Sequence, residues 1–250
     1  MKLILNIAIF IFLFFGLSWN SLSGQQSVYL DSISWEAYLQ KSRAKGPAFD
    51  FVRRDSTQPN LLIIGNSISI GYTPTVRTLL QGRANVYRIP ENGGDTRKFL
   101  ERNQTWLEGM NWEVIHINVG LHDLKRVDED GKLNTDYPRR ISPENYGAYL
   151  EKIFRILEEN TDAVIVWAST TFVPEGSEGR ISGDEILYNK ASLEVLKDFP
   201  NIMVNDLHAY SLGIKAFQRE ANVHYYPAGS AMLGSEVARV LGGILFSAGD

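Results

Sequence analysis

The sequence contains no cysteine, and this absence excludes several kinds of chemistry. Disulfide bonds, thiolate metal sites, cysteine nucleophiles and a lipid anchor on cysteine are all impossible. An excess of basic residues is also missing, since the formal net charge is −4. This mildly acidic balance argues against nucleic acid or an anionic membrane surface as a partner. Stability must therefore come from burial of apolar surface.

Long hydrophobic runs are missing except at the start of the chain. Lys2 supplies one positive charge, and Leu3–Leu17 is apolar apart from Asn6. Small residues follow at Ser23 and Gly24, which completes the pattern of a secretory signal peptide. A membrane anchor is the alternative, but the run is shorter than the roughly 20 apolar residues that a span needs. We expect cleavage near residue 24, a periplasmic or secreted protein, and no stable membrane span afterwards.

Removal of residues 1–24 would leave 226 of the 250 residues. Lys2 is the only charged residue in that segment, so the net charge would change from −4 to −5. A chain of this length is sufficient for one domain with a substantial core, which we expect to span residues 25–250.

Five short segments are typical of β-strands buried on both faces, because they are continuously apolar, rich in Val and Ile, and bounded by turn residues. They are Asn60–Ile64, Ala84–Ile89, Glu113–Val119, Asp162–Ala168 and Asn201–Asn205.

Helical patterns separate these strands. Ser142 and Pro143, for example, supply an N-cap and a proline at the first helical position. The predicted helices cover Ser34–Lys45, Thr96–Glu108, Ser142–Glu159, Ser182 or Asp184 to Asp198, and Pro227–Phe246. The alternation predicts an α/β fold, a three-layer α/β/α sandwich with about five parallel strands. The charged connection Lys125–Ile141 is either a solvated loop or the border of a binding site.

Ligands of open α/β sheets bind beyond the carboxyl ends of the strands, so the residues after each strand are the candidates for a site. Ser67 follows the first strand at a strand-to-helix turn, where the helix N-terminus favours a developing anion. Gly94 follows the second strand and either presents its N–H to an oxyanion or supplies a loop that needs positive φ. His122 and Asp123 follow the third strand. His224 lies just before the last helix, and a serine nucleophile needs such a base.

Taken in order, these loops resemble the sequence blocks of the SGNH (GDSL-like) hydrolases. The first block of that family is usually Gly-Asp-Ser and here reads Gly-Asn-Ser, ending at Ser67. The glycine of the second block corresponds to Gly94. The third block, usually Gly-x-Asn-Asp, reads Gly-Leu-His-Asp and ends at Asp123. The last block, usually Asp-x-x-His, reads Ala-Asn-Val-His and ends at His224, so the resemblance covers residues 60–246.

The resemblance implies a flavodoxin-like sheet and an esterase mechanism that needs no cofactor. Ser67 would attack an ester carbonyl, and His224 would take its proton and return it to the leaving alcohol. The resemblance also implies an oxyanion hole made of the N–H groups of Ser67 and Gly94 together with the side chain of residue 122. Water would then hydrolyse the acyl-enzyme.

Two positions depart from the family pattern. His122 replaces an asparagine, and it could donate a hydrogen bond as a neutral imidazole or stabilise an anion as an imidazolium. Ala221 stands where an acid normally orients the histidine. Glu220, Asp206 or a backbone carbonyl could take that role, and the sequence alone does not choose among them.

The other histidines and the aromatic residues have simpler interpretations. His116 lies within a predicted strand and is expected to be a core residue, and His208 is expected to be structural. Several aromatic side chains near the predicted crevice suit sugar rings, although such side chains more often belong to the core. They are Trp167, Phe172, Tyr188, Tyr225 and Tyr226.

These observations predict an exported hydrolase of carboxylic esters that removes O-acetyl or other short acyl groups from a carbohydrate or a small molecule. The absence of a broad apolar lid segment makes a long-chain lipase a poorer match. Two alternatives are a carbohydrate-binding protein that has lost turnover and an acyltransferase. No metal is expected, because the acidic segment Val127–Asp136 lacks the spacing of a calcium loop. The oligomeric state is not predicted.

Overall fold

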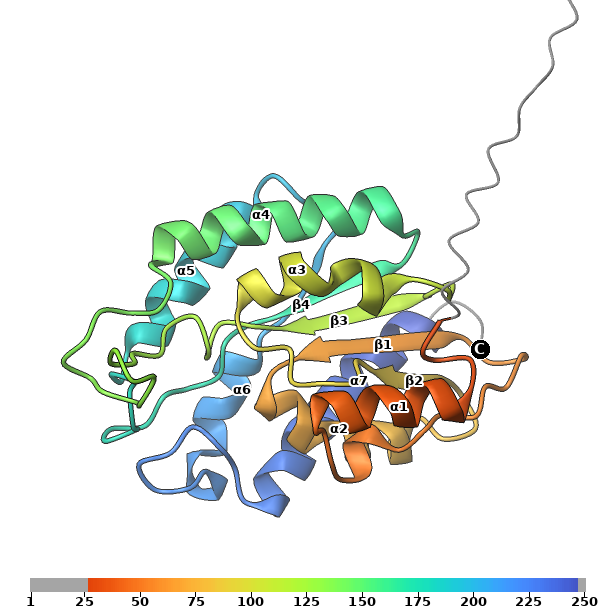
Figure 1. The fold of residues 1–250 in the computed structure, drawn as a ribbon, viewed down its shortest axis with the longest axis horizontal. Helices are drawn as coiled ribbons and strands as arrows, with labels where there is room; N and C mark the ends of the chain where they lie inside the picture. Colours follow the sequence, from red (N-terminus) through yellow and green to blue (C-terminus); the bar gives the residue numbers. More distant parts are fainter. Residues whose placement is uncertain (1–26, 247–250) are drawn as a thin grey trace, which may run out of the picture.

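Five apolar segments pair into one sheet in the computed structural model, which describes residues 27–246 (Figure 1). The strands are β1 (Asn60–Gly65), β2 (Asn85–Arg88), β3 (Val114–Asn118), β4 (Val164–Ala168) and β5 (Met203–Asn205). Their order is β2-β1-β3-β4-β5, and every neighbouring pair is parallel. This is the flavodoxin-like order, so the predicted α/β/α sandwich with about five parallel strands is confirmed. The predicted signal peptide, residues 1–24, lies outside the described residues.

The burial of each strand follows its place in the sheet. β1 and β3 are buried along their whole length, because each has a strand on either side and helices on both faces. The expectation of burial on both faces is wrong for β5, where Met203 is 44% and Val204 46% exposed. β5 is the edge strand, and it is only three residues long.

Seven α-helices connect and cover the strands within residues 27–246. They are α1 (Ser32–Ser42), α2 (Ser67–Leu79), α3 (Thr96–Leu107), α4 (Pro143–Asn160), α5 (Asp184–Leu196), α6 (Leu207–Gly213) and α7 (Pro227–Phe246). Side-chain caps set several helix starts. Asp31 accepts the N–H of Ser34 (2.8 Å) before α1, and Ser142 accepts that of Asn145 (3.3 Å) before α4. None of these helices combines the length and apolarity needed to cross a bilayer.

The helices form two layers, one on each face of the sheet. α3, α4 and α5 cover one face, and α2 and α7 pack together on the other (Figure 1). Because all the strands are parallel, the carboxyl ends of β1, β3 and β4 lie at the same edge of the sheet. The loops that precede α2, α4 and α5 begin at this edge.

Helices α2 and α7 approach each other closely through glycine. A Cβ atom on Gly234 of α7 would lie 2.6 Å from the Cβ of Thr75 and 2.8 Å from the carbonyl oxygen of Tyr72. A Cβ atom on Gly71 of α2 would lie 2.9 Å from Oγ of Ser230. A larger side chain at Gly234 would force the two helices apart, because its Cβ would meet the backbone of α2, whereas at Gly71 it would meet only the hydroxyl end of Ser230.

We therefore expect Gly234→Ala to lower the free energy of unfolding by about 1–3 kcal/mol, the usual cost of overpacking. The matched control is Gly243→Ala in the same helix, where an added Cβ meets no atom within 4 Å. That variant should be neutral or more stable by up to about 1 kcal/mol, because alanine favours the helix. Urea unfolding of both variants measures the difference. Equal stabilities would show that the close approach of α2 and α7 carries no constraint.

Candidate active site

Ser67 is the first residue of α2 and follows β1 directly. Gly65 lets the turn pass close to β3, since a Cβ atom there would lie 2.9 Å from the carbonyl oxygen of Asn118. Asn66 caps the helix by accepting the N–H of Ile68 (3.0 Å). The N–H of Ser67 is among the first in the helix, which have no acceptor within the helix itself. The turn thus places a hydroxyl and a free N–H at the carboxyl edge of the sheet.

A buried arginine holds this turn in place. Arg88, the last residue of β2, donates to the carbonyl of Gly65 and to Oγ of Ser69, each at 2.9 Å. It also donates to the carbonyl of Glu91 (2.6 Å), in the loop that leads to Gly94. Burial lowers the pKa of Arg88 to about 9, so the guanidinium remains charged at neutral pH. One cation therefore fixes the serine turn relative to the neighbouring loop.

His224 reaches Ser67 from the turn that precedes α7. Its Nε2 lies 2.8 Å from Oγ of Ser67, although the two residues are 157 positions apart in the sequence. Backbone hydrogen bonds close the turn, with the N–H of Arg219 donating to the carbonyl of His224 (2.9 Å) and that of Tyr226 to Phe217 (2.9 Å). The structure therefore brings together the two residues that the sequence predicted as nucleophile and base.

Asn222 orients His224, and sequence reasoning missed it. Its Oδ1 accepts both the backbone N–H of His224 (2.9 Å) and the ring Nδ1 (2.7 Å). Because the backbone N–H can only donate, this bond identifies the contacting amide atom as the oxygen, and Nδ1 must carry a proton. The lone pair of Nε2 then faces Ser67. The available signal was the Asx turn, in which an asparagine side chain bonds the backbone two residues further on.

None of the three predicted orienting groups lies at Nδ1. Ala221 has a left-handed backbone (φ 48°), and its side chain packs towards Gly176, where an added Cβ would lie 3.2 Å away. This turn brings Asn222 to the imidazole in place of the exposed Glu220. Asp206 instead caps α6, accepting the N–H of Ala209 (3.0 Å) and the hydroxyl of Ser169 (2.8 Å).

Burial lowers the pKa of His224 below its ordinary value, and the positive charges of Arg180 and Arg219 lower it further. The imidazole is therefore neutral at pH 7, the form that can accept a proton from serine. Asn222 supplies orientation without a negative charge, so it does not offset these effects.

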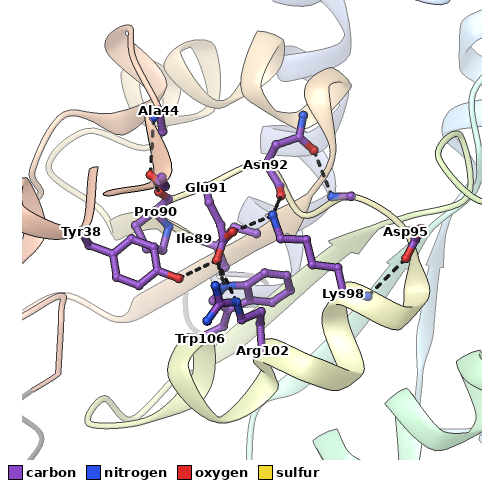
Figure 2. Close-up of polar contacts among 12 residues, drawn as sticks. Tyr38, Ala44, Ile89, Pro90, Glu91, Asn92, Asp95, Lys98, Arg102 and Trp106 are labelled. Atoms are coloured by element: carbon purple, nitrogen blue, oxygen red, sulfur yellow. Dashed lines mark hydrogen bonds and ion pairs between the residues drawn. The ribbon is translucent and has the colours of Figure 1, made fainter. Parts of the chain in front are cut away.

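The loop that carries Gly94 is anchored by a buried carboxylate. Figure 2 shows Glu91 receiving the Tyr38 hydroxyl (2.6 Å), the Trp106 indole N–H (3.1 Å) and the Lys98 ammonium (2.6 Å). Burial alone would raise the pKa of Glu91, but these donors hold it below its usual value. The loop is thus tied to both α1 and α3 while it passes the site.

Gly94 has a left-handed backbone (φ 63°), and its N–H donates to Oδ1 of Asn92 (3.0 Å). The positive φ fits the expectation of a loop that needs glycine. The N–H is occupied in this structure, so it can reach an oxyanion only after it exchanges the Asn92 side chain for the substrate oxygen.

His122 and Asp123 lie in the loop after β3 and have different surroundings. Burial, together with the charges of Lys125 and Arg180, lowers the pKa of His122 to about 3. The ring is therefore neutral at pH 7, and the imidazolium alternative is wrong. Asp123 is buried and accepts the N–H (3.0 Å) and hydroxyl (2.6 Å) of Thr96, which ties this loop to α3.

Two hollows adjoin these residues. One, of about 600 Å³, is lined by Ser67, His224, Arg219 and Tyr225 among others, and lies against α2 and the start of α7. The other, of about 450 Å³, is lined mainly by polar residues that include Gly94, His122 and Arg140. Arg140 belongs to the long connection 125–141, which thus borders the second hollow.

Most of the other aromatic and histidine side chains singled out in the sequence lie in the core. Trp167 and Tyr188 are fully buried, and Tyr225 is also buried (5% exposed) although it contributes to the lining of the hollow beside Ser67. His116 is fully buried in β3, which confirms its place in the core. His208 lies 3.6 Å from Glu185 rather than near Ser67. Within residues 27–246, no group of three or more His, Asp and Glu residues is arranged to hold a metal ion.

Similar folds occur among solved structures. The chain superposes on a GDSL-like lipase from Parabacteroides merdae (TM-score 0.61, 16% identity, 74% of this chain and 96% of that chain). It also superposes on the lipase/acylhydrolase from Enterococcus faecalis (TM-score 0.61, 18% identity, 74% and 96%). The fold is that of the GDSL-like hydrolases.

An acetylxylan esterase, Axe2 from Geobacillus stearothermophilus, has the same fold (TM-score 0.59, 17% identity, 74% of this chain and 94% of that chain). No family model matches the sequence, and a search of curated proteins found no match. The likeness is therefore one of structure at low sequence identity.

The role of Asn222 predicts how one substitution changes the base. Asn222→Asp keeps the shape of the turn but places a carboxylate at Nδ1, and a nearby negative charge favours the imidazolium. The pKa of His224 should therefore rise in the variant. An NMR titration of the four histidines measures it, with His224→Gln identifying the signal. An unchanged pKa would mean that residue 222 does not contact the ring in solution.

Proposed function

We propose that this chain is a serine esterase that removes acetyl or other short acyl groups from carbohydrate, with Ser67 as nucleophile and His224 as general base. The observation that carries the proposal is the 2.8 Å contact between Oγ of Ser67 and Nε2 of His224, with Asn222 fixing the ring from the other side. A nucleophile, a base and an orienting group in series form the arrangement that activates serine for acyl transfer.

The proposed mechanism uses Ser67 and His224 for both proton transfers. Oγ of Ser67 attacks the ester carbonyl while Nε2 of His224 takes the hydroxyl proton. The tetrahedral intermediate collapses, the bond to the alcohol breaks, and His224 returns the proton to the alcohol oxygen. Water then attacks the acyl-enzyme with His224 again as base, which releases the acid and restores the serine.

The oxyanion of the intermediate would be held by the N–H groups of Ser67 and Gly94 and by the neutral ring of His122. The helix N-terminus at Ser67 adds a favourable dipole. Because Gly94 donates to Asn92 in the structure, its N–H would join the hole only as the substrate oxygen displaces that amide. Each such donor is typically worth about 2.7–4 kcal/mol in the transition state.

A carbohydrate substrate is supported by the likeness to an acetylxylan esterase and by Tyr225 beside the reacting pair. The N-terminal sequence pattern supports export, which would bring the protein to polysaccharides outside the cytoplasm. The hollow of about 600 Å³ beside Ser67 is large enough for a sugar ring and a short acyl chain.

The alternative of a binding protein without turnover rested on Ala221 and His122. Asn222 supplies the orientation that Ala221 lacks, and His122 is neutral and able to donate, so neither departure argues for a dead site. Acyl transfer to a sugar in place of water would use the same two residues, and the products of the reaction distinguish it from hydrolysis.

The direct test is the release of p-nitrophenol from p-nitrophenyl acetate by the purified protein, beside Ser67→Ala and His224→Ala. We expect turnover by the parent and a loss of several orders of magnitude in kcat in each variant. In a profile of kcat/KM against pH, the activity of the parent should fall on the acidic side with a midpoint below about pH 6.5. The reason is that His224 must lose its proton to act and that its pKa is lowered. Equal rates in parent and variants would contradict the proposal.

A further inference from the structure

Three cationic side chains lie in the loops around the site. Arg219 lines the hollow that contains Ser67 and His224. Arg180 donates to the carbonyl of Leu121, next to His122, and its charge also lowers the pKa of His224. Lys125 lies three residues after His122. The charges that reach the base are thus both positive, from Arg180 and Arg219.

None of these three cations has an acidic partner in the described part of the chain, 27–246. Their neighbours differ in this respect. Asp95 pairs with both Arg97 (3.1 Å) and Arg140 (2.8 Å), and Lys98 pairs with Glu91 (2.6 Å). Asp95 and Glu91 are therefore already paired with cations, whereas Arg180, Arg219 and Lys125 are not paired with an acid.

Arg180 is held in its position by the loop that follows β4. Its Nε donates to the carbonyl of Leu121 (3.0 Å), next to His122, and Nη1 donates to the carbonyl of Glu178 (3.4 Å). The same loop packs against the histidine turn where Gly176 meets Ala221. The loop that carries Arg180 thus contacts both the His122 loop and the His224 turn, and both acceptors of the Arg180 side chain are neutral carbonyls.

Arg180 and Lys125 are partly buried, and partly buried cations without acidic partners are costly. Arg219 is exposed and lines the hollow beside Ser67. The protein has a net charge of −4 rather than an excess of basic residues. A cluster of such cations beside a nucleophile fits an anionic ligand better than a structural role. Guanidinium groups match carboxylates in a two-point geometry, which favours a carboxylate as that anion.

We propose that Arg180 and Arg219 select substrates whose alcohol part carries a carboxylate, so that the esters cleaved are acylated acidic sugars. The inference rests on the proposed function, because the proposed mechanism determines which side chains lie near the alcohol part of the ester and which lie near the acyl part. His224 returns its proton to the leaving alcohol, so side chains around His224 face the alcohol and not the acyl group. The charge therefore belongs to the sugar.

The test compares two esters that differ only in charge, an O-acetylated methyl glucuronoside and the primary amide of the same compound. Acetate release gives kcat/KM for each. We expect the parent to prefer the carboxylate at least tenfold, about 1.4 kcal/mol in the transition state, with a smaller preference at high ionic strength. Arg180→Gln and Arg219→Gln should each lower this ratio towards one. The matched control is Arg54→Gln, an exposed cation that precedes β1 at the other end of the sheet, which should keep the parent's ratio.

The outcomes separate this inference from the proposed function. Two outcomes would overturn the choice of an acidic sugar and leave the esterase in place. In both, p-nitrophenyl acetate is cleaved, and the two sugar esters are either cleaved equally or not cleaved at all. A preference that survives both arginine substitutions would also overturn it. Failure to cleave any of the three esters would overturn the esterase itself.

Discussion

The close packing of α2 against α7 determines where the two reacting side chains lie. α2 begins at Ser67, and α7 begins at Pro227, three residues after His224. Gly234 allows these helices to approach within a distance that an added Cβ would prevent. The 2.8 Å contact between Ser67 and His224 therefore depends on the interface between the helix that begins at Ser67 and the helix that follows His224. Backbone hydrogen bonds within the turn at residues 217–226 hold the imidazole of His224 in a fixed position relative to the start of α7.

The charges around the reacting pair follow a common pattern. Arg88 is buried among neutral carbonyl and hydroxyl acceptors, His122 is neutral, and Asn222 replaces a carboxylate with an amide. Negative charge close to His224 is thus missing, while Arg180 and Arg219 contribute positive charge. Such a site keeps its base unprotonated at neutral pH and favours negative charge in whatever it binds.

Much of the fold could be predicted from the sequence, because the strands are continuous apolar runs and the helix starts carry strong caps. β5 was predicted as fully buried because its residues are apolar. Its position at the edge of the sheet exposes Met203 and Val204. The order of strands in a sheet cannot be read from the residues of one strand. Ser67 and His224 were found because Ser67 follows a recognisable strand and His224 precedes a recognisable helix. Asn222 was missed because the family pattern directs attention to position 221, where a left-handed backbone shifts the useful side chain by one residue. The bond between Gly94 and Asn92 and the grouping of Arg180 with Arg219 depend on loop packing over long separations in sequence.

Covalent labelling with a fluorophosphonate measures whether Ser67 is activated by His224, since this reagent traps an activated serine as a stable adduct. We expect one adduct per chain on the peptide that contains Ser67, formed rapidly by the parent protein. His224→Ala, which leaves the serine but removes its base, should react far more slowly. Labelling of a different serine, or equal labelling with and without His224, would contradict the claim that these two residues form one catalytic unit.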